Sequence, residues 1–133
     1  MKKSGFVTLV VAVGLLIVAF SPPVMDLAEQ SDNVHFGQHV LILLAGLMVA
    51  YAFQSLGGHR LFVDAGLARR GLGLAGLGMV LFLATQVPAV DVVADQSIPI
   101  HMFVHLVTLA AGGLIGIGFL SLASEPSKGL PAR

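Results

Sequence analysis

The chain has 133 residues, of which 56% are hydrophobic and 11% charged, and its formal net charge is zero. A soluble domain would carry roughly twice this share of charged residues, so the composition indicates one integral membrane domain in the lipid bilayer, covering residues 1–133. The zero net charge gives no reason to expect a nucleic acid partner. The absence of cysteine excludes thiolate metal sites, iron–sulfur clusters, covalent c-type haem and disulfides.

Four apolar stretches are predicted to be transmembrane helices, because each approaches the ~20 residues that a helix needs to cross a bilayer. They are Gly5–Phe20, Phe36–Leu56, Gly71–Val87 and Ile100–Leu122. Prolines support these bounds: Pro22 follows the first stretch, Pro88 the third, and Pro99 precedes the fourth. The predicted fold class is therefore all-α, a bundle of four transmembrane helices.

All seven basic residues lie on one side of this predicted topology: before the first stretch, between the second and third, and after the fourth. The two remaining loops contain only acidic charges, at Asp26, Glu29, Asp32, Asp91 and Asp95. By the positive-inside rule, both termini are expected to be cytoplasmic and the acidic loops extracytoplasmic, in a prokaryotic cytoplasmic membrane. A secretory signal peptide ending near Ser21 is the alternative; the lack of a clear small-x-small cleavage site favours a retained span.

The chain contains an internal repeat of two spans. The motif His35-Phe-Gly-Gln-His39 returns 66 positions later as His101-Met-Phe-Val-His105, and Gly46 returns at the same offset as Gly112. The predicted units are repeat 1 at 5–58, repeat 2 at 71–124 and a cytoplasmic tail at 125–133. Since each repeat holds two spans, the copies should be related by a pseudo-twofold axis along the membrane normal. The glycines favour close packing of the helices.

The histidines of each pair are four residues apart, so they project from one face of a helix, roughly 6 Å apart at Cβ. A pair with this spacing can close on one metal ion. If the axis passes between the two helices, all four imidazoles face one another near the outer surface. The predicted metal ligands are His35, His39, His101 and His105. Glu29 and Asp95, six residues before each pair, are placed to add an oxygen ligand or to accept a ring N–H.

Imidazoles without thiolates suit copper, zinc, iron or nickel, and an outward-facing site without cysteine favours copper. Zinc is an alternative ion. The second hypothesis is b-type haem, held by histidines from two helices for electron transfer. A single histidine near a membrane interface could instead hydrogen-bond a loop carbonyl, but four at matched positions favour a functional role. His59 has no counterpart and is expected to be solvated.

The second histidine motif resembles that of a known family. His101-Met-Phe-Val-His105-Leu106 is similar to the His-Met-x-x-His-Leu motif of the caa3-type cytochrome oxidase assembly factors, polytopic membrane proteins associated with copper insertion. Small archaeal membrane proteins of unknown function with paired histidines are similar in size. The resemblance implies metal-ligand roles for the four histidines, copper as the metal, and a role in oxidase assembly or copper supply.

Two further expectations concern partners and activity. A third hypothesis makes the chain an accessory subunit of a larger respiratory or monooxygenase membrane complex. The pattern Gly112-x3-Gly116 is compatible with a homodimer. No nucleophile or acid–base pair is evident in the sequence, so an enzyme with its own turnover is not expected.

Overall fold

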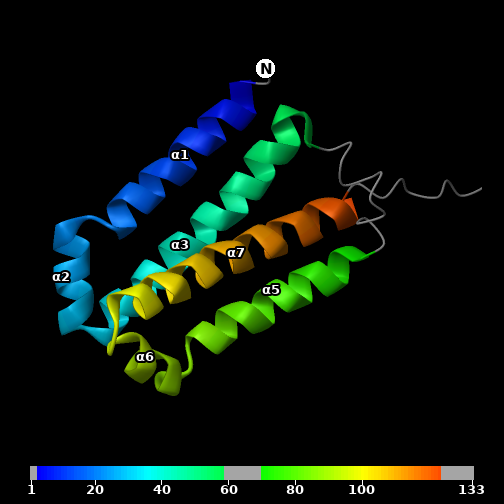
Figure 1. The fold of residues 1–133 in the computed structure, drawn as a ribbon. Coiled ribbons are helices and arrows are strands. Elements are labelled where there is room, and N and C mark those ends of the chain that lie inside the picture. Colours follow the sequence, from blue (N-terminus) through cyan, green and yellow to red (C-terminus); the bar gives the residue numbers. More distant parts are fainter. Residues whose placement is uncertain (1–2, 59–69, 124–133) are drawn as a thin grey trace, which may run out of the picture.

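The computed structural model describes residues 3–58 and 70–123, and every element in these ranges is helical. The elements are α1 (Lys3–Ala19), α2 (Pro22–Gln30), α3 (Asp32–Phe53), the π-helical turn η1 (Gln54–Gly58), α5 (Gly71–Thr85), α6 (Pro88–Ala94) and α7 (Ile98–Ala123). The predicted all-α fold class is therefore confirmed for the described residues. A long helix, a short helix and a second long helix follow one another twice along the chain (Figure 1).

Two helices are long and apolar enough to cross a membrane as single elements: Asp32–Gly57, which is α3 extended into η1, and α7. The other two predicted spans are each a pair of helices joined at a bend, of 53° between α1 and α2 and of 65° between α5 and α6. The described chain thus has two clear apolar spans, and four if each bent pair counts as one.

The bends coincide with prolines. Pro22 and Pro23 occupy the first turn of α2, and Pro88 occupies the first position of α6. A proline lacks the N–H that would continue the preceding helix, yet its fixed φ suits the start of a new one. The sequence predicted loops in both places. They form short helices instead, which change the direction of the chain before α3 and α7 begin.

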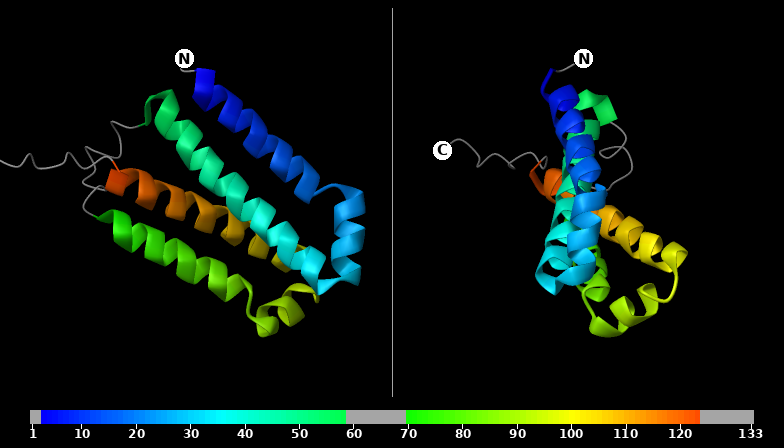
Figure 2. Two further views of the ribbon diagram at one scale, coloured as in Figure 1. Left: turned by 180° about the vertical axis from the view of Figure 1, so that it is seen from behind. Right: turned by 90° about the vertical axis from the view of Figure 1, so that its left-hand side faces the viewer.

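The four long helices lie side by side in the order α1, α3, α7, α5 (Figures 1 and 2). The two central helices pack against each other, and each outer helix packs mainly on the central helix of its own repeat. The helices form a row rather than a closed ring, with the α1–α3 pair inclined to the α5–α7 pair (Figure 2, right). This order places both histidine-bearing helices at the centre of the molecule.

The helices α3 and α7 cross closely at two glycines. A Cβ atom on Gly46 would run into the carbonyl oxygen of Leu109, and a Cβ atom on Gly112 would run into that of Leu43. The two contacts are equivalent, because Gly46 and Leu43 correspond to Gly112 and Leu109 at the 66-residue offset. Small residues let helix backbones approach in this way within lipid. The packing of α3 on α7 therefore follows the pseudo-twofold relation between the repeats.

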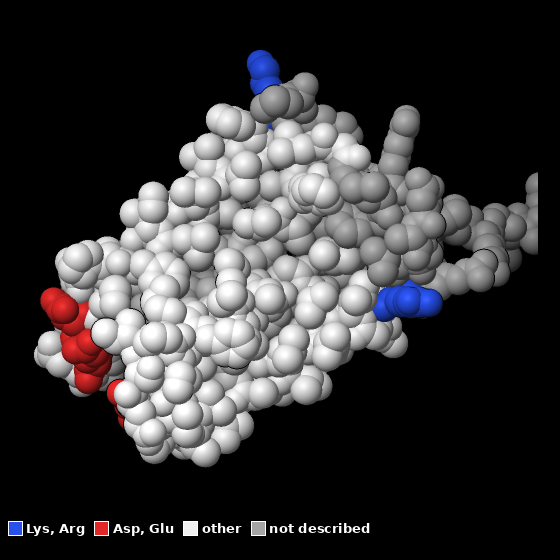
Figure 3. All heavy atoms as spheres, in the orientation of Figure 1, with Lys and Arg blue, Asp and Glu red and all other residues white. Residues whose placement is uncertain are grey.

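Charge is confined to the two ends of the described molecule (Figure 3). The acidic residues lie on α2, on and directly after α6, and at the start of α3, whereas Lys3 and Arg70 lie at the opposite end. The surface between the ends is apolar, with large side chains such as Phe6, Val80 and Phe119 exposed. This pattern suits helices that cross a bilayer.

Candidate metal centre

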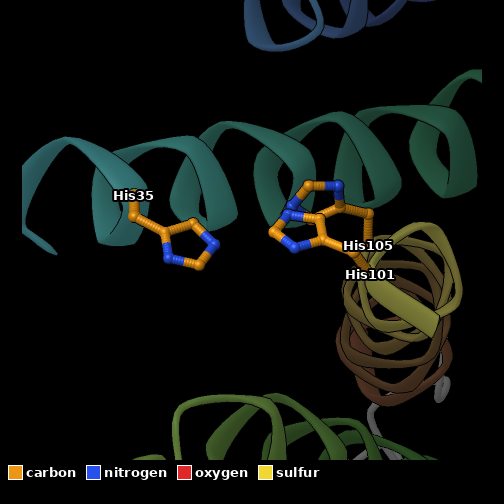
Figure 4. Close-up of side chains that lie close together, drawn as sticks. All are labelled: His35, His101 and His105. Atoms are coloured by element: carbon orange, nitrogen blue, oxygen red, sulfur yellow. The ribbon is translucent and has the colours of Figure 1, made fainter. Parts of the chain in front are cut away.

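The four paired histidines lie together at the acidic end of the molecule. His35 and His39 project from α3, and His101 and His105 from α7. Their rings meet in the space between the two helices, and Figure 4 shows three of them. His39 and His105 are almost fully buried, with 2% and 3% of their surface exposed, and the other two are half-buried. These four residues form the histidine cluster; His59 lies outside the described residues.

The rings of the histidine cluster are arranged almost symmetrically. Within each pair the ring centroids are 4.7 Å apart. Across the pairs, His35 stacks on His101 at 5.4 Å, and His39 meets His105 edge-on at 5.1 Å. Each of these cross-pair contacts joins two residues that correspond at the 66-residue offset. These two contacts are the ones that a pseudo-twofold relation between the repeats would bring together.

Several ring nitrogens of the cluster are buried without a hydrogen-bond partner in the described part of the chain. They are His35 Nε2, His39 Nε2 and both Nδ1 and Nε2 of His105. One ring nitrogen from each of His35, His101 and His105 lies within 4.8 Å of the others. A buried polar atom left unpaired costs about 1–3 kcal/mol. The fold therefore holds these nitrogens together against a penalty that a bound ion would remove.

His39 has a polar partner that the sequence analysis missed. The side-chain nitrogen of Gln86, directly after α5, lies 2.9 Å from His39 Nδ1 and 2.9 Å from Thr85 Oγ1. Thr108 Oγ1 lies 3.3 Å from Thr85 Oγ1. Thr85 and Thr108 are buried, and Gln86 is half-buried. The available signal was the polar pair Thr85-Gln86 at the end of an otherwise apolar stretch.

His105 has an aromatic neighbour instead. The ring of Phe20, directly after α1, meets the imidazole of His105 at a centroid distance of 5.3 Å and an interplanar angle of 70°. Phe20 and Gln86 each follow the last residue of their outer helix. The residue directly after each outer helix thus contacts the buried histidine of the other repeat. The phenyl ring of Phe20 contacts His105, and the amide of Gln86 contacts His39.

The two predicted carboxylate residues differ in their placement. Asp95 Oδ1 lies 3.7 Å from His101 Nδ1, which is within the range of an ion pair and too long for a hydrogen bond. Glu29 is exposed on α2, and no hydrogen bond or ion pair joins it to the histidine cluster within residues 3–58 and 70–123. The structure therefore brings Asp95 to the edge of the cluster and leaves Glu29 outside it.

A pocket of about 170 Å³ lies beside the cluster at the acidic end. It is lined by Asp32, His35, Phe36, His39, Gln86 and Asp91. Two carboxylates that the sequence analysis had not selected therefore border the same pocket as the buried imidazole of His39. Carboxylates that line a pocket favour cations in it.

The chain was also compared with known proteins. No protein-family model matches it, and the searches of curated proteins and of solved structures found no significant match.

Proposed function

We propose that the protein binds a metal ion, copper in the first place, in the histidine cluster between α3 and α7 of a membrane-embedded fold. The observation that carries the proposal is the convergence of four imidazoles, two from each repeat, whose buried nitrogens lack hydrogen-bond partners in the described chain. Ionisable groups inside a membrane are rare and are usually kept for a function. A structural role for one histidine would not require matched pairs on both helices.

The cluster needs only small movements to bind an ion. Metal–imidazole bonds of about 2.0–2.1 Å place the ligating nitrogens of a tetrahedral site roughly 3.3 Å apart. The nitrogens of His35, His101 and His105 lie within 4.8 Å of one another. Rotation of the side chains can close the remaining ~1.5 Å while α3 and α7 stay in place. His39 lies outside this group of nitrogens, but its ring centroid is 4.7 Å from that of His35, and we propose it as the fourth ligand.

Copper is the first choice among the metals that imidazole binds. Nitrogen ligands suit copper, zinc, iron and nickel, and of the divalent first-row ions copper binds such sites most tightly. The similarity of the second motif to that of the oxidase assembly factors supports the same choice. Zinc, for which four histidines provide the preferred tetrahedral geometry, is the alternative ion.

A single ion fits the site better than b-type haem does. Haem held by two axial histidines requires a wide, flat slot between them. The pocket beside the cluster has a volume of about 170 Å³, which is below the roughly 300–1,000 Å³ of ordinary cofactor sites. Each ring of the cluster also lies against another ring. The haem hypothesis predicts a Soret band in the purified protein, and the ion hypothesis predicts none.

The charge distribution supports an extracytoplasmic site. In the positive-inside arrangement, the end with Lys3 and Arg70 lies in the cytoplasm and the end with the histidine cluster lies outside. We therefore propose that the protein stores copper there, or passes it to a respiratory oxidase during assembly in a prokaryotic cytoplasmic membrane. A site between membrane helices favours delivery by direct contact with a membrane partner.

Metal analysis of the full chain tests the proposal. The protein is purified in detergent and titrated separately with Cu(I), Cu(II) and Zn(II), each in competition with a chelator of known affinity. We expect a single bound ion per wild-type chain and loss of binding in the variant that combines His39→Ala with His105→Ala. His59→Ala, which removes the histidine that has no repeat counterpart, should bind as the wild type does. Equal binding by the double variant and the wild type would refute the proposal.

Orientation can be tested separately, because the chain has no cysteine of its own. Single cysteines are introduced by Gln96→Cys at the acidic end and by Arg70→Cys at the basic end. In intact cells, a membrane-impermeant maleimide should label the first variant and not the second. The reverse labelling would establish the opposite orientation.

A further inference from the structure

Gln86 links the buried histidine of the first repeat to the second repeat. It directly follows α5, whereas its partner His39 lies on α3. A neutral imidazole carries its proton on one ring nitrogen and accepts a hydrogen bond at the other. The group that faces Nδ1 therefore decides whether Nε2 is free to bind a metal.

The amide of Gln86, as placed, favours the tautomer that does not bind a metal through Nε2. Its nitrogen lies 2.9 Å from His39 Nδ1, and an amide N–H can only donate. Nδ1 is then the acceptor, and the ring proton lies on Nε2, which is buried without a partner in the described chain. In this form His39 offers no lone pair to an ion in the cluster.

A half-turn of the amide reverses this preference. The carbonyl oxygen of Gln86 then faces Nδ1 and accepts its N–H, which leaves Nε2 free to ligate. The hydroxyl oxygen of Thr85 lies 2.9 Å from the amide nitrogen of Gln86 in the structure. It can serve both orientations of the amide, because a hydroxyl can accept from the amide nitrogen or donate to the amide oxygen. Thr85 Oγ1 also lies 2.7 Å from Phe82 O and 3.3 Å from Thr108 Oγ1. In the structure Thr85 donates its hydroxyl proton to Phe82 O and accepts from Gln86 and Thr108, so donation to the turned amide oxygen would replace the hydrogen bond to Phe82 O.

The corresponding place in the other half of the site holds no amide. Phe20 meets His105 edge-on and can neither accept nor donate a conventional hydrogen bond there. Both ring nitrogens of His105 lack partners within the described ranges. The two buried histidines of the cluster therefore differ: His39 has a side-chain partner at Nδ1, whereas His105 has none at either nitrogen within the described ranges.

We propose that Gln86 is a positioning residue that sets the tautomer of His39. Its amide nitrogen holds His39 in the form that does not ligate through Nε2, and a half-turn of the amide admits the ion. The ring stays neutral, since the proton that leaves Nε2 is replaced by one on Nδ1. This inference rests on metal binding by the cluster, and it makes His39 the last ligand to join, after His35, His101 and His105.

Two substitutions test this role of Gln86. Gln86→Glu keeps the shape of the side chain but presents only acceptors to Nδ1 when ionised, so it should hold the ring proton there. Gln86→Met keeps the length and removes the hydrogen bond. The control is Gln96→Glu, which introduces the same carboxylate at an exposed position of the acidic end.

Long-range proton–nitrogen NMR of the full chain, labelled at histidine, determines the tautomer in the absence of metal. We expect the His39 proton on Nε2 in the wild type and in Gln96→Glu, and on Nδ1 in Gln86→Glu. In Gln86→Met we expect a mixture of the two neutral tautomers. The same His39 tautomer in the wild type and in both Gln86 variants would overturn the inference. Circular dichroism of each variant verifies that the helices are intact.

Titration with Cu(I) gives the second readout. Substitution of a residue that orients a ligating histidine usually lowers metal affinity by about 10–100-fold. We expect Gln86→Glu to bind with an affinity at or above that of the wild type, and Gln86→Met to bind about 10–100-fold more weakly than Gln86→Glu, because only the carboxylate holds the ring proton on Nδ1. If the tautomer depends on Gln86 but the wild type binds no copper, the metal proposal fails and the role of Gln86 toward His39 stands. If copper binds equally to all variants, the amide does not control ligation and the inference fails.

Discussion

The two repeats are alike where their helices cross and different where their histidines meet. At the crossing, Gly46 and Gly112 make equivalent contacts with the opposite backbone. At the acidic end, His39 faces an amide and His105 faces a phenyl ring. A backbone contact leaves no room for a side chain on either helix, whereas the side chains around the rings can differ without changing the helix spacing. The backbone contacts at the helix crossing are therefore equivalent in the two repeats, whereas the surroundings of the buried histidines are not.

Buried polar side chains extend this contrast along the helices. Gln38 donates to the carbonyl of Ala19 at 2.8 Å, and its counterpart in the second repeat is Val104. Thr108 has none of its surface exposed, and its counterpart Ile42 has 1% exposed. The two repeats thus fill equivalent buried positions with side chains of different polarity.

The largest effect on stability is expected at the crossing. Gly46→Ala and Gly112→Ala each place a methyl group against a carbonyl of the facing backbone, so each should lower the free energy of unfolding by about 1–3 kcal/mol. Because the contacts are equivalent, the two losses should be similar. Unfolding in mixed micelles, followed by circular dichroism, measures both. Gly76→Ala is the control, because a methyl group there meets no neighbouring atom within 4 Å. Clearly unequal losses would show that the crossing is not symmetric.

A smaller effect is expected for a hydrogen bond that the other repeat lacks. Gln38→Leu removes the side-chain donor to the buried carbonyl of Ala19 and should lower the free energy of unfolding by about 1–2 kcal/mol. Gln30→Leu removes the same kind of bond, to Asp26 O at 2.9 Å, from an exposed site. It should change the free energy by less than about 0.5 kcal/mol. The same unfolding assay compares the two, and equal losses would contradict the role assigned to burial.

The smallest effect is expected at the carboxylates. Asp95→Asn weakens an ion pair with His101 in which the Asp95 side chain is 73% exposed, and exposed ion pairs contribute about 0–1 kcal/mol. Glu29→Gln, at the corresponding position, should have no measurable effect on unfolding. A double-mutant cycle of Asp95→Asn with His101→Asn isolates the coupling. A coupling well above ~1 kcal/mol would mean that this carboxylate is part of the site rather than at its edge.

The helices and the meeting of the histidines follow from patterns that are local or repeated. Apolar runs of nearly membrane length predict the four long helices, and the prolines predict where α1 and α5 end. The i, i+4 spacing places each histidine pair on one face of its helix. Repetition of that spacing predicts that the rings face one another, and in the structure they do so because α3 and α7 are neighbours at the centre of the row.

The contacts of Gln86 and Phe20 could not be predicted in this way. They depend on the order of the helices in the row and on how far each outer helix extends before its bend. No periodicity in the sequence encodes that distance. For the same reason Asp91 borders the pocket from α6. Asp32, by contrast, lies three residues before His35 on α3 and shares its face of the helix, a periodicity that the choice of Glu29 had overlooked.

Two separate copies of one unit that met at the Gly46–Gly112 crossing would carry every substitution twice, once on each side of their symmetry axis. In a single chain the two copies are encoded independently, so a glutamine can stand beside His39 while a phenylalanine stands beside His105. Joining the two copies in one chain therefore allows histidines at matching positions to have different neighbours. In the proposed function, three imidazoles would hold the ion and the fourth would control when its shell closes, a difference in roles that two identical chains related by symmetry would not provide.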